Sequence, residues 1–273
     1  MSDPRLLVER REGSAWITLN RPEVHNAIDW SMWRRLREIL LELDADPSVR
    51  VVVLQGAGDR AFSAGSDLAE FARLSTDEVR ACFRDMELTI ATVERISVPV
   101  VASVQGYVLG SALELMLACD VQIASRRARF GMPIARLGIM LEPPFAGRLV
   151  RVIGPARTRD LLFSGRQLSA AEAARAGMVA RLVAPSALKA TVDEYVATVL
   201  AGSPRSIEAA KRSVRTVQDR WLPGPDGAEE PYYIDEADFR EGVSAFLAKR
   251  KPQFEGRRNG AEGHHGGAGS GTR

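Results

Sequence analysis

Hydrophobic and polar positions alternate along the chain in short blocks that predict strands and helices in turn. Residues 14–19 alternate as a half-buried strand does, residues 51–54 form an unbroken apolar run typical of a strand buried in a parallel sheet, and residues 98–104 predict another buried strand. Between the first two strands, apolar residues recur at helical spacing after Asp29, which is suited to cap the helix. This succession indicates an α/β fold built of repeated ββα or βαβ units.

The same pattern continues through the rest of the chain. It predicts helices over residues 76–95, 157–163 and 170–176 and short strands over residues 120–125 and 179–183. The remaining residues read as helical, with breaks at residues 202–204 and 223–231. From residue 257 the sequence is Gly-rich and polar, which predicts disorder.

Composition narrows the possible functions. The 273 residues carry a net charge of only +2 with both signs interspersed, so nothing indicates nucleic-acid binding, and no run is long and apolar enough to span a membrane. Cys82 and Cys119 make no disulfide framework and no targeting segment is visible, which favours the cytoplasm. Of three histidines only His25 falls within the predicted fold, which argues against a Ser-His-Asp hydrolase and against a zinc site. We therefore expect carboxylates to carry out any acid–base chemistry and backbone amides to bind any anion.

One stretch carries both of these features, GYVLGSALELMLACD at residues 106–120. Gly110 and Ser111 open a helix, whose N-terminus presents unpaired N–H groups and a partial positive charge. Glu114 follows within one turn among apolar neighbours, where an ionised carboxylate is costly. An anion site beside a proton carrier indicates carbonyl chemistry, and the alternative is a Glu114 that only caps or pairs within a buried helix.

Six motifs occur in an order and spacing that resemble the crotonase (enoyl-CoA hydratase/isomerase) family over about residues 8–256. They are LNRPEVHNAI, AFSAGSDLAEF, GYVLGSALELMLACD, ARFGMPIARLGI, GPARTRDLLFSGRQLSAAEAARAGMVARLV and EGVSAFLAKRKPQF. The resemblance implies a spiral of ββα units over residues 1–200 and a helical region for trimerisation and CoA contact over residues 201–256. It also implies an acyl-CoA substrate, no metal or redox cofactor, and a homotrimer or dimer of trimers. Residues 257–273 would be the disordered tail.

The family's shared chemistry is the stabilisation of a thioester enolate by two backbone N–H groups. By motif these are the amides of Ser66, which follows Ala64 and Gly65, and of Ser111, which follows Gly110. Further substrate or CoA contacts implied by the resemblance are Val24, Ala27, Ala64, Asp67, Leu68, Tyr107, Leu109, Gly110, Pro133, Ile134, Phe246 and Lys249. Lys249 and the nearby Lys251 could equally belong to a solvated basic helix end.

The acid–base residues depart from the family's hydratase pattern. Typical hydratases hold a water between two glutamates; Glu114 matches the first, but Ile134 replaces the second and cannot carry a proton. Glu142 stands in a second loop that supplies a carboxylate in dienoyl-CoA isomerases, although before Pro143 it could instead point to solvent. We therefore expect C=C isomerisation by Glu114 and Glu142, with hydration by Glu114 as the alternative.

Two functions outside catalysis also follow from the family. Ser111 and Ile134 are compatible with a non-catalytic acyl-CoA-binding pseudoenzyme, whereas retention of Glu114 argues against one. A short arginine cluster at residues 34–37 allows for an RNA-binding homologue, but the glutamates that follow indicate an ordinary solvated helix face.

Overall fold

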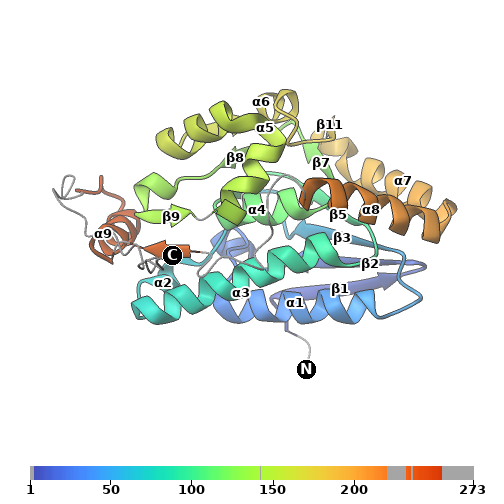
Figure 1. Cartoon of the computed structure of the whole chain (residues 1–273), viewed down its shortest axis with the longest axis horizontal. Helices are drawn as coiled ribbons and strands as arrows, with labels where there is room; N and C mark the ends of the chain where they lie inside the picture. The colour runs from blue at the N-terminus through green and yellow to red at the C-terminus, as the bar shows by residue number, and fades with distance from the viewer. Residues whose placement is uncertain (1–2, 142, 220–231, 235, 254–273) are drawn as a thin grey trace, which may run out of the picture.

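A mostly parallel sheet passes through the centre of the computed structural model, which describes residues 3–141, 143–219, 232–234 and 236–253 (Figure 1). Within these residues it has six strands, in the spatial order β1 (Leu6–Arg11), β2 (Ser14–Leu19), β3 (Val51–Gly56), β5 (Val100–Val104), β7 (Val121–Ser125) and β11 (Arg181–Val183). Only the first pair is antiparallel. The strands predicted from the alternation and from the apolar runs are confirmed, and β5 begins two residues later than expected.

Helices cover both faces of this sheet. Helices α1 (Trp30–Asp44) and α3 (Thr76–Arg95) pack together on one face, and α7 (Leu188–Ala201) covers the other (Figure 1). The helix predicted after Asp29 is confirmed, because the Asp29 side chain accepts a hydrogen bond from the Met32 amide at 2.9 Å. Apolar side chains on both faces explain why the central strands are apolar without alternation.

A second sheet lies at the carboxyl ends of the central strands. Its four described strands have the order β10 (Gln167–Ser169), β8 (Arg129–Gly131), β6 (Tyr107–Leu109) and β4 (Ala61–Ser63). Three long strands, β3, β5 and β7, are each followed by a short strand of this second sheet. The repeated ββα unit is thereby confirmed. The loops that leave β4 and β6 lie side by side because these strands are paired in parallel.

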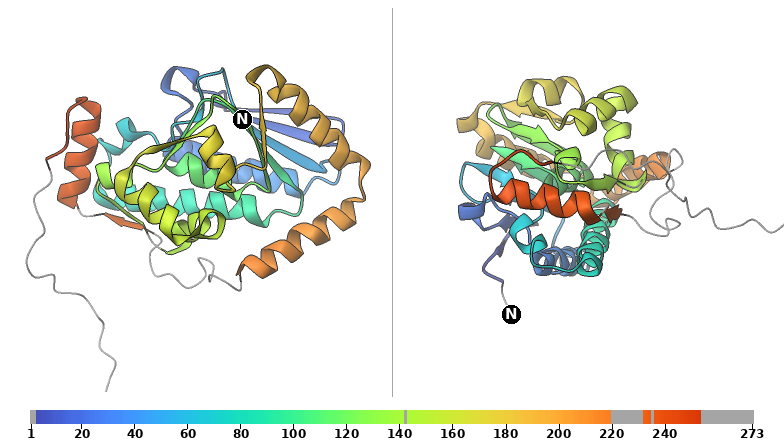
Figure 2. Two further views of the ribbon diagram at one scale, coloured as in Figure 1. Left: turned by 90° about the horizontal axis from the view of Figure 1, so that it is seen from above. Right: turned by 90° about the vertical axis from the view of Figure 1, so that its left-hand side faces the viewer.

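The remaining elements surround this framework (Figure 2). They are η1 (Pro22–Val24), α2 (Leu68–Phe71), α4 (Ser111–Ala118), η2 (Ile134–Arg136), β9 (Ile139–Leu141), α5 (Pro143–Ser164), α6 (Ala170–Arg175), η3 (Pro185–Ala187), α8 (Pro204–Asp219), β12 (Tyr232–Ile234) and α9 (Glu236–Leu247). The short helix predicted over residues 157–163 is the second half of α5, which bends at Gly154. Its first half was not predicted, although Phe145, Leu149 and Ile153 recur every four residues.

The C-terminal part of the chain is helical where it is described. Helix α8 contains no apolar residue that is buried, and Val214 and Val217 on it are more than half exposed. A role of residues 201–256 in oligomerisation stays a prediction, and residues 257–273 lie outside the described residues. None of the described helices is long and apolar enough to cross a membrane.

Asn26 should be a major source of stability, because it ties the loop after β2 to the connection between β3 and β4. Its buried amide donates to the Ala57 and Ala61 carbonyls at 3.0 and 2.8 Å and accepts from the Arg21 amide at 3.0 Å, at a φ of 56°. We expect Asn26→Ala to lower the free energy of unfolding by about 3 kcal/mol, measured by urea denaturation.

A control for this variant is Gln105→Ala, which removes one exposed side-chain hydrogen bond to Gly58. It should change the free energy of unfolding by no more than about 0.5 kcal/mol. Equal effects of the two substitutions would contradict the special role of Asn26.

Candidate active site

Two backbone segments meet at the centre of the site. Ala64, Gly65 and Ser66 follow β4, and Gly110 links β6 to the first residue of α4, Ser111. Gly65 has a φ of 90°, and a Cβ at this position would lie 2.5 Å from the Leu109 carbonyl oxygen and 3.2 Å from the Ser111 nitrogen. The two segments are therefore in direct backbone contact, which only glycine at position 65 permits.

The structure places the two predicted amide donors next to each other. Ser111 is the first residue of α4, so its N–H has no partner within the helix. Within the described residues no hydrogen-bond acceptor faces the Ser66 N–H. The two hydroxyl groups are 3.0 Å apart, so the Ser111 side chain is accommodated by pairing with Ser66. Two neighbouring free amides can stabilise an oxygen that gains negative charge.

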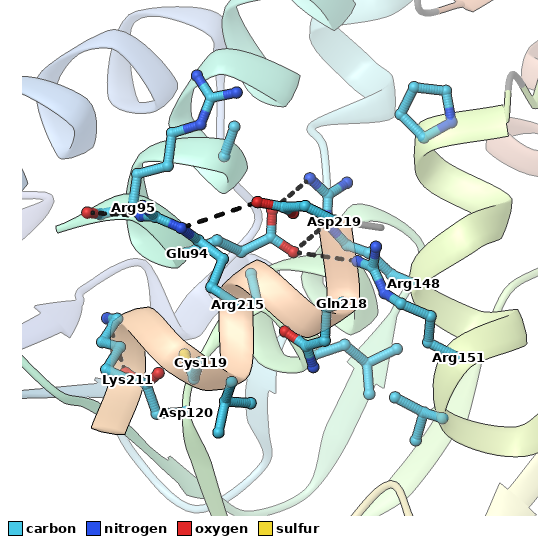
Figure 3. A pocket seen from close by; sticks show the side chains of 16 residues that line it. Glu94, Arg95, Cys119, Asp120, Arg148, Arg151, Lys211, Arg215, Gln218 and Asp219 are labelled. Carbon is cyan, nitrogen blue, oxygen red and sulfur yellow. Dashed lines mark hydrogen bonds and ion pairs between the residues drawn. The ribbon is translucent and has the colours of Figure 1, made fainter. Parts of the chain in front are cut away.

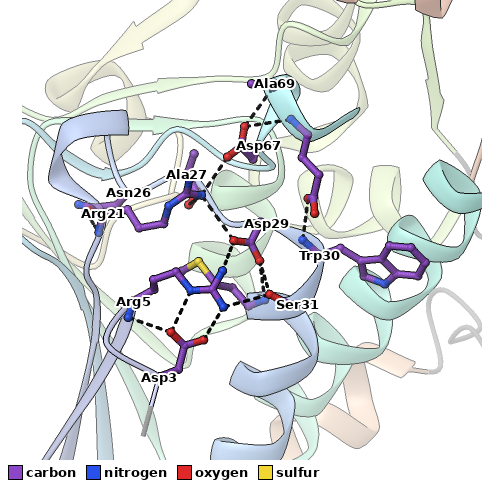
Figure 4. A network of polar contacts seen from close by, with 12 residues as sticks. Asp3, Arg5, Arg21, Asn26, Ala27, Asp29, Trp30, Ser31, Asp67 and Ala69 are labelled. Carbon is purple, nitrogen blue, oxygen red and sulfur yellow. Dashed lines mark hydrogen bonds and ion pairs between the residues drawn. The ribbon is translucent and has the colours of Figure 1, made fainter. Parts of the chain in front are cut away.

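A network of ion pairs supports the first of these segments (Figure 4). Arg21 donates to the Asp67 carboxylate at 2.9 Å and to the Ala27 carbonyl at 3.0 Å. Asp67 in turn caps α2 by accepting from the amides of Ala69 and Glu70. Asp67 and Ala27, predicted as substrate contacts, thus hold the Ser66 segment in place.

A cavity of about 990 Å³ opens beside the amides and is mostly apolar. Of the predicted contacts, those that line it are Ala64, Ser66, Leu68, Leu109, Gly110, Ser111, Pro133, Ile134, Phe246 and Lys249. No carboxylate is among its described lining residues. Positive charge comes from Lys251, which the sequence reasoning weighed together with Lys249, and from two arginines that it missed, Arg136 and Arg250. Such a lining suits an apolar chain joined to an anionic group.

Other predicted site residues lie outside this lining. Val24 and Tyr107 are each 40% exposed, and the Tyr107 ring lies 6.0 Å from the His25 ring. Their contact with CoA stays a prediction. Glu142 lies outside the described residues, so its predicted role stays a prediction as well.

Glu114 is fully buried, as the sequence predicted, and is not among the residues that line the cavity. Neither of its carboxylate oxygens has a hydrogen-bond partner among the described residues, and Oε2 lies 4.0 Å from Arg148 Nη1. Burial raises the pKa of Glu114 well above its ordinary value of 4.5, an effect that the charge of Arg148 opposes and those of Glu87 and Glu94 reinforce. Once ionised, such a carboxylate is a strong base.

A cluster of charged side chains that the sequence reasoning missed surrounds Glu114. Arg148 on α5 donates to both oxygens of Glu87, at 2.9 and 2.6 Å, and to both oxygens of Glu94, each at 2.9 Å. Glu94 also pairs with Arg151 at 3.5 Å (Figure 3). Glu94 and Arg148 line a second cavity of about 310 Å³ between α3, α5 and α8. The sequence does hold one sign of this cluster, because Glu87 is a charged residue at a position within the apolar stripe of α3.

In the part of the chain that the structure describes, no three His, Cys, Asp or Glu side chains are placed to hold a metal ion.

Known proteins resemble this chain over most of its length. The model of the family described as enoyl-CoA hydratase/isomerase matches residues 9–257. The chain is 35% identical to the 2,3-dehydroadipyl-CoA hydratase of Escherichia coli, over 92% of this chain and 99% of the relative. It is 32% identical to the crotonyl-CoA hydratase of Syntrophomonas wolfei, over 93% and 99% of the two chains. A solved structure of a monofunctional enoyl-CoA isomerase from M. smegmatis superimposes with a TM-score of 0.68 at 34% identity, covering 80% of this chain and 95% of that one.

Because the pKa of Glu114 is raised on folding, its contribution to stability should depend on pH. The folded protein holds this proton more tightly than the unfolded chain, so the contribution is largest below pH 4.5 and is lost as pH rises toward the folded pKa. Glu114→Gln has no charge to bury. Relative to wild type it should gain on the order of 1–3 kcal/mol in free energy of unfolding between pH 5 and pH 8.

Urea denaturation at several pH values measures this difference. The exposed Glu23→Gln variant is the control, since it makes the same change at the surface. A stability difference for Glu114→Gln that stays flat with pH would contradict the prediction.

Proposed function

The chain belongs to the enoyl-CoA hydratase/isomerase family, and we propose that it moves a carbon–carbon double bond along an unsaturated acyl-CoA. The observation that carries this proposal is the chemistry of the cavity. Ile134 lines it where the hydratase pattern has a second glutamate, and no described lining residue is acidic. Glu114, one turn beyond Ser111 on α4, is therefore the proton carrier that we assign to the reaction.

The residues present fit such a reaction. With a 3-enoyl-CoA, the Ser66 and Ser111 amides would hold the thioester oxygen while ionised Glu114 removes a proton from C2. The electron pair of that C–H bond forms the C1=C2 bond of a dienolate as the carbonyl π pair moves onto the oxygen, where negative charge collects. When the proton is returned to C4, the C3=C4 pair forms the new C–H bond, the C1=C2 pair becomes C2=C3, and the thioester carbonyl re-forms to give a 2-enoyl-CoA. One carboxylate can carry out both transfers, and no water is consumed.

Glu114 must gain access to the substrate for this chemistry, because it is fully buried and is not among the lining residues. Its raised pKa makes the ionised carboxylate a better match for a weakly acidic C–H group. Glu142 would be the partner carboxylate of the predicted two-carboxylate mechanism.

Hydration of a 2-enoyl-CoA is the second candidate, because two of the similar proteins are named as hydratases. It would need a water held at C3 by a single glutamate, without help from Ile134. The apolar lining favours isomerisation over this alternative.

The rest of the proposal concerns binding and assembly. The CoA moiety would lie along Phe246 and Lys249, with Arg250 and Lys251 beside its phosphates. The enzyme would work without a metal or redox cofactor, as a homotrimer or dimer of trimers in the cytoplasm.

Turnover of 3-enoyl-CoA and 2-enoyl-CoA in deuterated water, followed by mass and absorbance, tests the reaction. We expect wild type to convert the 3-enoyl-CoA without gain of water and Glu114→Gln to lose at least about 10²-fold in kcat. Loss in Glu142→Gln as well would support the two-carboxylate mechanism. Net addition of water to the 2-enoyl-CoA, with no migration of the double bond, would establish hydration instead.

The backbone origin of the anion site makes a separate prediction. Gly65→Ala would push the two segments apart, so we expect kcat to fall by about 10²–10³-fold. Ser66→Ala keeps the amide and should lose less than about tenfold. Thermal melts of both variants control for folding, and an equal loss in both would assign the effect to the Ser66 hydroxyl.

A further inference from the structure

The guanidinium of Arg148 has one N–H group left over, and it belongs to the nitrogen nearest Glu114. An arginine side chain has five N–H donors. Among the described residues, one from Nε, one from Nη1 and two from Nη2 go to Glu87 and Glu94. The remaining donor is on Nη1, which lies 4.0 Å from Glu114 Oε2.

This distance is too long for a hydrogen bond but short for two charged groups in the interior. A neutral Glu114 gains little from Arg148 at this separation. An ionised Glu114 is drawn toward the free N–H, and a shift of about 1 Å would complete the bond. The free N–H of Arg148 is therefore placed to bind the carboxylate of Glu114 once that carboxylate is charged.

The other charges around Glu114 are balanced. Glu87 and Glu94 face it from α3, and Arg148 and Arg151 face it from α5. The two carboxylates fix the direction of the Arg148 guanidinium and offset its positive charge. Arg148 can then steer Glu114 without holding it as a permanent ion pair.

We propose that Arg148 is the positioning residue for Glu114, using its fifth N–H to hold the carboxylate when Glu114 ionises, while Glu87 and Glu94 orient the guanidinium and limit its charge. The proposal rests on the proposed function for the catalytic use of Glu114. The contact itself is independent of which reaction the enzyme performs.

Charge-changing variants test the proposal through the protonation of Glu114. Arg148→Gln removes the positive charge and should move the midpoint of Glu114 ionisation to higher pH, by about 1 pH unit or more. Glu94→Gln removes a negative charge at a partly exposed position, keeps the shape, and should move the midpoint to lower pH. Arg159→Gln is the matched control, an exposed arginine on the same helix, and should leave the midpoint unchanged.

Infrared difference spectra across pH report this midpoint directly, as the protonated-carboxyl band that is absent from Glu114→Gln. The pH profile of kcat gives a second readout, which should shift in the same directions. If Arg148→Gln does not fold, Glu94→Gln tests the proposal in its place. A folded Glu94→Gln variant with an unchanged midpoint of Glu114 ionisation overturns the proposal. Infrared shifts without any double-bond migration would uphold the role of Arg148 and reject the proposed reaction.

Discussion

The close approach of two backbone segments, after β4 and after β6, is the constraint on which the site depends. Parallel pairing of the two strands brings their carboxyl ends together, and Gly65 lets the second segment pass within van der Waals distance. The amides of Ser66 and Ser111 are fixed by this contact rather than by flexible side chains. Arg21 and Asp67 then hold the first segment from outside. Donors on such a rigid support need little rearrangement when charge develops on a bound oxygen.

Glu114, in contrast, lowers the stability of the fold. Burying Glu114 without a hydrogen-bond partner is unfavourable in its ionised form, and Arg148 compensates only at a distance. An apolar residue at position 114 would avoid this cost. The proposed role of Glu114 as a proton acceptor with a raised pKa would give this burial a chemical purpose.

The lining of the cavity distinguishes this chain from the usual hydratase pattern. The chain has the backbone amides and the spiral of ββα units that are expected of the family. In the cavity wall, however, Ile134 stands where the hydratase pattern has a glutamate that can carry a proton. Relatives named as hydratases and a structural neighbour named as an isomerase are similarly distant in sequence. Overall sequence identity therefore does not distinguish hydration from isomerisation for this chain.

Sequence alone determined most of the architecture, because apolar periodicity reports directly on local structure and on which face is buried. The capped helix after Asp29, the central strands and the burial of Glu114 among apolar neighbours were all predictable in this way. The resemblance to the family pointed to the two amides as candidate donors, and the structure shows a glycine with positive φ before each of them.

Only the tertiary structure decided what surrounds Glu114. Glu87 and Glu94 on α3 are 61 and 54 residues from Arg148 on α5, and no local pattern shows that they converge. It also showed that Asp67 and Ala27 support the Ser66 segment, because that role depends on a contact with Arg21 across the fold. Long-range pairing of charges is set by how helices pack, which periodicity does not encode.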